Sequence, residues 1–273
     1  MLPQTLPIRF LLNLGGNTVS SDGPKGMDGP ASPPDDDGGV RPDFMNPGSS
    51  GLASPGDSAG MRSGIKSMRR LEGLGKALGL TALWFKEAGY GYERVPFEPM
   101  AAYSALAREI LEDLKEEPFP THFFAQAGNG EMAAALTVHF REALGDRKPR
   151  IIIVEPANAD CVLESVLASK PTPDTGDLET SMRSLASREV SRFAWTVLRE
   201  GADAFLSISD HAAEATVILL RNGEEDDPSV KTGPSGAAGL AGLIAASFEP
   251  ALTGPLALGP ESRVLAIGWE GPA

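Results

Sequence analysis

The sequence predicts an α/β fold: a doubly wound, mostly parallel sheet with helices on both faces. From Tyr103 onward, segments with helical periodicity alternate with short apolar segments, as in chains built from parallel βαβ units. Ile151–Val154 is a continuous apolar run, which is typical of a strand buried on both faces of a parallel sheet. With 273 residues, 41% of them hydrophobic, the chain is long enough for a sizeable core.

The N-terminal part of the chain predicts little structure. Residues 15–60 are dominated by Gly, Pro, Ser and Asp, and such a segment cannot bury enough apolar surface to offset its ordering entropy. The preceding apolar run, Leu2–Leu14, is interrupted by Pro3 and Pro7 and is too short to span a bilayer. We therefore expect residues 1–61 to form a disordered leader and residues 62–273 to form the folded domain.

The folded domain is expected to begin with a helix that ends at Gly79, because apolar residues recur at helical spacing from Ile65 to Leu78. A strand over Leu80–Phe85 follows. The remaining pattern predicts helices over residues 104–115, 132–144, 160–168, 192–199, 211–221 and 235–246, and strands over residues 122–126, 150–154, 204–208 and 263–267.

Charge and cysteine content restrict the possible functions. The 24 basic and 37 acidic residues give a formal net charge of -13, which would repel nucleic acid and anionic membrane surfaces. Cys161 is the only cysteine, so an intramolecular disulfide and a cysteine-rich zinc site are excluded. We expect a soluble, cytoplasmic protein that binds neither nucleic acid nor membrane.

The most informative local motif is the glycine-rich turn Gln126–Met132, which leaves an apolar strand and enters a helix. Glycines let the backbone approach an anion closely, and the free N–H groups of a helix N-terminus favour a phosphate. Many such turns are glycine-rich for steric reasons alone, so both interpretations stay open. Glu131 places a carboxylate beside the expected anion, or simply complements the N-terminal end of the helix dipole.

Other candidate motifs favour structural roles. Gly233–Gly242 predicts a closely packed helix of small residues, and Ala237 stands where a hydrolase nucleophile elbow would need its last glycine. His122, His139 and His211 are scattered without ligand spacing, so no metal site is expected.

Several segments together resemble the diaminopropionate ammonia-lyase family, relatives of the fold-type-II pyridoxal-phosphate enzymes that include tryptophan synthase β. Thr121–Gly130 resembles the strand and phosphate loop of that family, and Val154–Pro156 with Ala159–Cys161 resembles the following Glu-Pro and Ala-Asp-Cys signatures. Further matches, in the family's order, are Thr180–Met182, Ala194–Trp195, Val197–Arg199, Gly233, Ser235–Ala237, Glu261–Leu265 and Glu270–Gly271.

The resemblance implies pyridoxal phosphate as cofactor and a small amino acid as substrate. It also implies the residues that would bind the cofactor's phosphate, which are Gly128, Asn129, Gly130, Glu131 and Met132.

One departure from the family bears directly on function. Leu80–Glu87 is similar to the family strand that shortly precedes the lysine that holds the cofactor, but Lys86 does not match that lysine. The following segment, which includes Gly91–Glu93, resembles a part that the family carries much later, so a stretch on the order of a hundred residues is missing. An alternative ungapped register puts Glu98 at the lysine position. In either register the amine is absent.

Other family-matched positions also differ. Arg188 stands where a glycine is usual in the family, and Pro234 where the family has glutamate. Trp269 stands near the position at which the family has a small hydroxyl residue that meets the pyridine nitrogen. No residue of this chain is therefore assigned a catalytic role.

Three hypotheses follow. We favour a degenerate, catalytically impaired relative, whether a pseudoenzyme or a degraded gene product. The second is an active lyase that releases ammonia from 2,3-diaminopropionate or a similar amino acid to give an α-keto acid, with a lysine from a second chain or with Lys66, Lys76 or Lys86. The third is an interaction protein without a ligand. In the family, the missing stretch also contains most of a smaller domain that covers the cofactor. Because its loss exposes apolar surface, we expect a homodimer or an unstable, aggregation-prone monomer.

Overall fold

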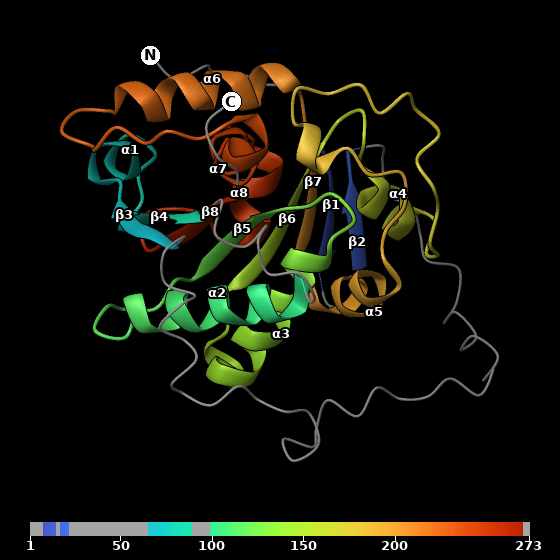
Figure 1. The fold of residues 1–273 in the computed structure, drawn as a ribbon, viewed down its shortest axis with the longest axis horizontal. Coiled ribbons are helices and arrows are strands. Elements are labelled where there is room, and N and C mark those ends of the chain that lie inside the picture. Colours follow the sequence, from blue (N-terminus) through green and yellow to red (C-terminus); the bar gives the residue numbers. More distant parts are fainter. Residues whose placement is uncertain (1–7, 15–16, 22–64, 89–98, 270–273) are drawn as a thin grey trace.

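The structure, a computed structural model, describes residues 8–14, 17–21, 65–88 and 99–269. Their strands form one eight-stranded sheet in the order β2-β1-β7-β6-β5-β8-β4-β3 (Figure 1). The five central strands, from β7 to β4, are parallel, while β1, β2 and β3 are antiparallel to their neighbours. The strands are β1 (Ile8–Leu14), β2 (Asn17–Ser20), β3 (Ile65–Arg70), β4 (Ala82–Ala88), β5 (His122–Gln126), β6 (Arg150–Pro156), β7 (Ala204–Ile208) and β8 (Arg263–Trp269).

Helices cover both faces of this sheet (Figure 1). On one face lie α1 (Glu72–Ala77), α6 (Asp210–Asn222), α7 (Pro234–Ser247) and α8 (Pro250–Leu256), which share a core with alternate strand residues such as Phe124 and Val154. On the other face lie α2 (Pro99–Asp113), α3 (Glu131–Leu144), α4 (Cys161–Leu167) and α5 (Arg192–Gly201). Short 3-10 turns occur at Gly145–Arg147 (η3) and Arg183–Leu185 (η4). The predicted doubly wound α/β fold is therefore confirmed.

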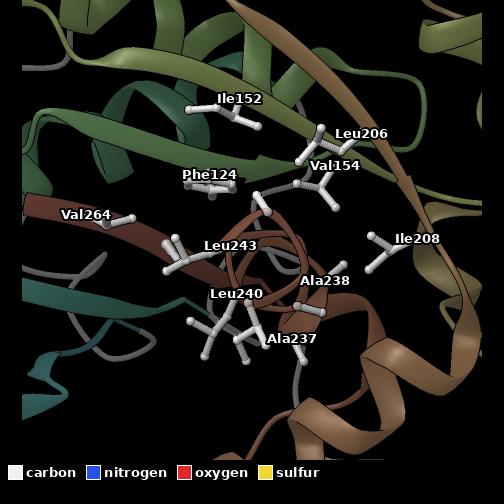
Figure 2. Packing of buried hydrophobic residues seen from close by; sticks show 14 of the residues in the cluster. Phe124, Ile152, Val154, Leu206, Ile208, Ala237, Ala238, Leu240, Leu243 and Val264 are labelled. Carbon is white, nitrogen blue, oxygen red and sulfur yellow. The ribbon is translucent and has the colours of Figure 1, made fainter. Parts of the chain in front are cut away.

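The small-residue helix α7 packs directly onto the middle of the sheet (Figure 2). A Cβ on Gly239 would lie 2.8 Å from the carbonyl oxygen of Phe124, and one on Gly242 would lie 2.6 Å from Val154. No larger side chain fits at either position without moving the helix. The predicted role of this stretch in close packing is confirmed.

The helix predicted from Ile65 to Leu78 is wrong in its first half. Ile65–Arg70 is the edge strand β3, and only Glu72–Ala77 is helical. The pairing of β3 with β4 shifts register between Ile65 and Met68, as a β-bulge does. A bulge adds a residue to the two-residue period of a strand, which produced an apolar spacing that resembles a helix.

The leader predicted over residues 1–61 is wrong where the structure describes it. Ile8–Leu14 pairs with β7, and Asn17–Ser20 pairs with β1. Phe10, Leu11 and Leu12 are buried in the cores on the two faces of the sheet. The folded unit therefore includes segments before residue 62, and the other residues of the predicted leader, 1–7, 15–16 and 22–61, lie outside the described residues.

The other predicted elements are confirmed with small shifts at their ends. The predicted strand over 122–126 matches β5, and the predicted helix over 211–221 is α6, which starts one residue earlier and ends one later. Helix α8 is an element that the sequence did not predict. Among the described helices none is by itself long and apolar enough to cross a membrane, although α7 and α8 together pass that test as a pair bent by 100°. The expected homodimer stays a prediction.

Candidate functional site

The glycine-rich turn between β5 and α3 has a backbone that only glycine adopts easily. Gly130 is the N-cap of α3 with φ 84° and ψ -3°, in the left-handed region. A Cβ there would lie 2.8 Å from the Cβ of Ala194 in α5, and a Cβ on Gly128 would lie 3.1 Å from the backbone of Leu185 in η4. Both glycines therefore let neighbouring segments pack tightly against the turn.

The turn directs its N–H groups away from the neighbouring helices. The carbonyl of Gly128 accepts a hydrogen bond from Cys161 Sγ at 3.5 Å, and the carbonyl of Asn129 accepts one from Ser191 N at 2.9 Å. Because carbonyl and N–H point in opposite directions across a trans peptide, the N–H groups of Asn129 and Gly130 face the other side. Neither N–H finds an acceptor among the described residues. This turn presents donors suited to an anion.

A cavity of about 300 Å³ lies against the turn, a size within the range of small-ligand sites. All five residues predicted to bind the cofactor line it: Gly128, Asn129, Gly130, Glu131 and Met132. The other lining residues are Tyr103, Gln126, Ala127, Ser184, Leu185, Ala186 and Ser187.

Gln126 also lines the cavity, but its side-chain amide is enclosed. The residue is only 2% exposed, and neither Oε1 nor Nε2 has a hydrogen-bond partner among the described residues. A Cβ on Gly239 of α7 would lie 3.4 Å from its Oε1, so the amide packs against that helix. An unsatisfied buried polar group costs about 1 to 3 kcal/mol.

Tyr103 and Glu131 are the two described lining residues whose side chains can ionise by losing a proton. Burial raises the pKa of the Tyr103 hydroxyl, and the nearby Glu131 carboxylate raises it further. Tyr103 therefore stays protonated at neutral pH and can donate a hydrogen bond. Among the described residues that line the cavity, none is Lys, Arg or His.

Residues 95–267 match the family model described as pyridoxal-phosphate dependent enzyme. The chain belongs to this family. Diaminopropionate ammonia-lyase of Escherichia coli (strain K12) is 35% identical over 185 residues, which cover 66% of this chain and 46% of that protein. The Salmonella typhimurium (strain LT2) protein of the same name is 34% identical over 189 residues, which cover 66% and 47%. This member of the family therefore spans slightly less than half the length of these curated relatives.

Solved structures agree with this assignment. Diaminopropionate ammonia lyase from Escherichia coli, in complex with an aminoacrylate-PLP azomethine reaction intermediate, aligns with a TM-score of 0.58 and 34% identity over 63% of this chain and 44% of that chain. The processed form of threonine deaminase isoform 2 from Solanum lycopersicum aligns with a TM-score of 0.52 at 18% identity, over 64% of this chain and 46% of that chain, and shows the fold alone. The sequence resemblance to the fold-type-II enzymes is confirmed.

The cavity fits one end of the family's cofactor and not its covalent attachment. Its backbone donors suit a phosphate group. No lysine lines it among the described residues. Lys86, on β4, is only 2% exposed and its Nζ lies 2.6 Å from Asp113 and 3.6 Å from Glu109, both on α2. The Lys86 amine therefore forms ion pairs with two carboxylates of α2 and does not line the cavity.

The other lysines considered from the sequence do not fill the gap. Lys76 is exposed and pairs with Glu225 at 3.0 Å. The side chain of Lys66, the segment with Gly91–Glu93 and Glu98, and the side chain of Trp269 lie outside the described residues.

Two residues that differ from the family pattern, Arg188 and Pro234, have structural roles. Arg188 donates to the carbonyls of Asp174 at 2.6 Å and Gly176 at 3.2 Å, and so fixes the loop after α4. Pro234 occupies the first turn of α7, where its fixed φ suits a helix start.

The three histidines take no part in the cavity. His122 Nε2 bonds the carbonyl of Leu256 at 2.8 Å, and burial lowers the pKa of the ring. His139 Nε2 lies 2.9 Å from Ser104 Oγ, and His211 is exposed. No group of three potential metal ligands occurs within the part of the chain that the structure describes.

Sequence reasoning missed the opposite wall of the cavity. Ser184–Ser187 reaches the turn because Ser184 N donates to Ser235 Oγ at 3.2 Å, which ties η4 to the start of α7. No local signal marks this contact, since it joins segments far apart in sequence. Gln126 carried a detectable signal, a polar residue that ends an apolar strand.

Proposed function

We propose that this chain is a catalytically impaired relative of the pyridoxal-phosphate dependent ammonia-lyases. It would bind the phosphate end of the cofactor at Gly128–Met132 without covalent attachment. The observation that carries this proposal is a cavity with free backbone donors whose described lining contains no lysine.

The absence of a lysine from the described lining is the reason to expect a loss of activity. When bound, the cofactor supplies an electron sink, while a lysine of the enzyme holds it and moves the substrate's α-proton. In this chain the Tyr103 hydroxyl is held protonated because its pKa is raised, so it can orient a ligand by donating a hydrogen bond but is a poor base. The Glu131 carboxylate is the only carboxylate among the described lining residues, and it follows the anion-binding turn directly.

Similarity at 34–35% identity to diaminopropionate ammonia-lyases supports the second hypothesis, an active lyase that forms an α-keto acid and ammonia from 2,3-diaminopropionate. That activity requires an amine that the described lining does not supply, for example from Lys66 or from another chain. The two proposals predict different labelling patterns.

The test is an absorbance spectrum of the purified chain with pyridoxal phosphate, before and after borohydride reduction, with peptide mapping of any label. We expect reversible binding, no single labelled lysine, and no α-keto acid from 2,3-diaminopropionate. A band fixed by reduction to one lysine, with turnover, would contradict the proposal and support the active lyase. Lys66→Arg, with Lys76→Arg as the matched control, would then show whether Lys66 is that amine.

A further inference from the structure

Glu131 is unusual because its carboxylate follows directly on a turn built to receive an anion. Its backbone N–H is bonded by Asn129 Oδ1 at 3.1 Å, which fixes the first residue of α3 beside the open N–H groups of Asn129 and Gly130. Within the described part of the chain, Glu131 has no ion-pair partner. A bound phosphate would therefore lie near a second negative charge that no described side chain neutralises.

Like charges in a partly buried site repel strongly, because the surrounding dielectric constant is low. The simplest neutralisation is a positive charge on the ligand itself. A ligand with a phosphate and an ammonium group would place the phosphate on the backbone donors and the ammonium against the carboxylate.

We propose that this cavity selects phosphate monoesters that carry a primary ammonium group, and that Glu131 is the residue that recognises the ammonium. The inference rests on the proposed function and goes beyond it, because it names the form of ligand preferred. For ring-bearing ligands of the cofactor type, the amine form is bound in preference to the hydroxyl form.

The rest of the lining supports this assignment. Tyr103 and Glu131 line the same cavity, and burial, followed by the Glu131 carboxylate, raises the pKa of the Tyr103 hydroxyl, so this hydroxyl is a neutral donor. The backbone N–H groups of Asn129 and Gly130, without an acceptor among the described residues, offer donors to the phosphate of the same ligand. The lining thus holds neutral donors and one carboxylate.

An acidic residue in the first turn of a helix also has an ordinary explanation, since it complements the helix dipole. That explanation predicts an effect on stability and none on ligand preference. The two are separated by measuring which ligand binds better.

The experiment is calorimetric titration of the full-length protein with pyridoxamine phosphate and with pyridoxine phosphate. These two probes share ring and phosphate and differ only in an ammonium against a hydroxyl, and neither forms a covalent bond with lysine. For the wild type we expect the amine form to bind about tenfold more tightly, as one charge-assisted hydrogen bond allows. Glu131→Gln, which keeps the shape, should reduce this preference to less than about twofold.

Glu142→Gln is the matched control, since Glu142 is exposed at the far end of α3, does not line the cavity, and changes the net charge equally. It should leave the preference unchanged. Phosphoethanolamine, which lacks a ring, tests whether the ammonium and phosphate suffice, and its affinity should also fall in Glu131→Gln.

The outcomes separate this inference from the proposed function. Equal binding of both ring-bearing probes, or a preference that survives in Glu131→Gln, overturns the role of Glu131 and leaves the phosphate site intact. If none of the probes binds, both the inference and the proposed cofactor site are wrong.

Discussion

The N-termini of α3 and α4 occupy similar places in the fold, but different groups accept hydrogen bonds from their first N–H groups. Each helix follows a parallel strand, β5 or β6, and the two strands are neighbours in the sheet. At α4, the Glu155 carboxylate accepts from Val162 N through Oε1 and from Leu163 N through Oε2, both at 2.8 Å. At α3, one side-chain oxygen, that of Asn129, caps a single N–H, and the N–H groups of the turn stay open among the described residues.

The comparison indicates that the N-terminus of α3 keeps backbone donors open for a ligand, whereas at α4 the chain supplies its own carboxylate. At α4 the carboxylate of Glu155 is fully buried, and burial of its charge is unfavourable. Desolvation therefore raises the pKa of Glu155 well above its usual range, although its two backbone hydrogen bonds oppose that shift. The neighbouring Asp160 has a pKa raised to about 6, mainly by burial. Asp174 caps Asp160 N at 3.0 Å, which completes a closed, structural cluster.

The largest effect is expected where the open turn meets α5. Gly130→Ala adds a Cβ at φ 84°, at a position 2.8 Å from the Cβ of Ala194. The left-handed conformation costs about 1 to 2 kcal/mol, and overpacking adds about 1 to 3 kcal/mol. We expect the free energy of unfolding to fall by about 2 to 5 kcal/mol in urea denaturation, and phosphate-ligand affinity to fall with it.

Gly79→Ala is the control for this change. Gly79 also has positive φ, at 70°, but an added Cβ there would meet nothing within 4 Å. It should cost only the conformational part, about 1 to 2 kcal/mol, and leave ligand affinity unchanged. Equal losses in the two variants would show that the contact between the turn and α5 contributes nothing.

An intermediate effect is expected at the closed helix end. Glu155→Gln keeps one acceptor and replaces the other with a donor that faces a buried N–H, so unfolding free energy should fall by about 1 to 3 kcal/mol. Asn129→Ala at the open end should cost only about 0.5 to 1 kcal/mol, because water replaces the cap at an exposed N–H. Denaturation of both variants tests the comparison, and a larger loss in Asn129→Ala would reverse it.

The last prediction concerns an effect that appears only as the pH changes. Because the pKa of Asp160 is raised from 3.8 to about 6 in the folded state, the native protein binds this proton more tightly than the unfolded chain does. Its contribution to stability therefore declines as pH rises from 3.8 to about 6. Asp160→Asn resembles the protonated form, so its stability relative to wild type should increase across this window by on the order of 1 to 2 kcal/mol.

Thermal unfolding of both proteins across the same window measures this difference. Arg9 lies 3.4 Å from Asp160 and also pairs with Glu164. Because the Glu164 pair is unchanged in Asp160→Asn, we expect Arg9 to stay near α4 in both the wild type and the variant. A stability difference that does not change with pH would show that Asp160 titrates as it does in the unfolded chain.

Local patterns were sufficient for much of the fold and for the position of the turn. Ile151–Val154 is continuous and apolar because it is buried on both faces. Gly130 marks the strand-to-helix turn by its positive φ, and Gly128 by the close approach of Leu185. The family resemblance added the expected cofactor.

What the sequence did not reveal depends on contacts between distant segments. Ile8–Leu14 is a strand because β7 offers it a sheet edge, and nothing near it in sequence shows this. The same holds for Ser184–Ser187 in the cavity wall. The unsatisfied state of Gln126 also depends on packing against α7, where a Cβ on Gly239 would lie 3.4 Å from its Oε1.

The pairing of β1 with β7 also dictates an order of folding. Ile8 pairs with Ile208, so most of the chain separates two strands that must meet. At a synthesis rate of about 5 to 20 residues per second, the first strand waits on the order of ten seconds or more for its partner. During that time the apolar β1 segment is a ready partner for other strand edges, and chaperones would be most needed then.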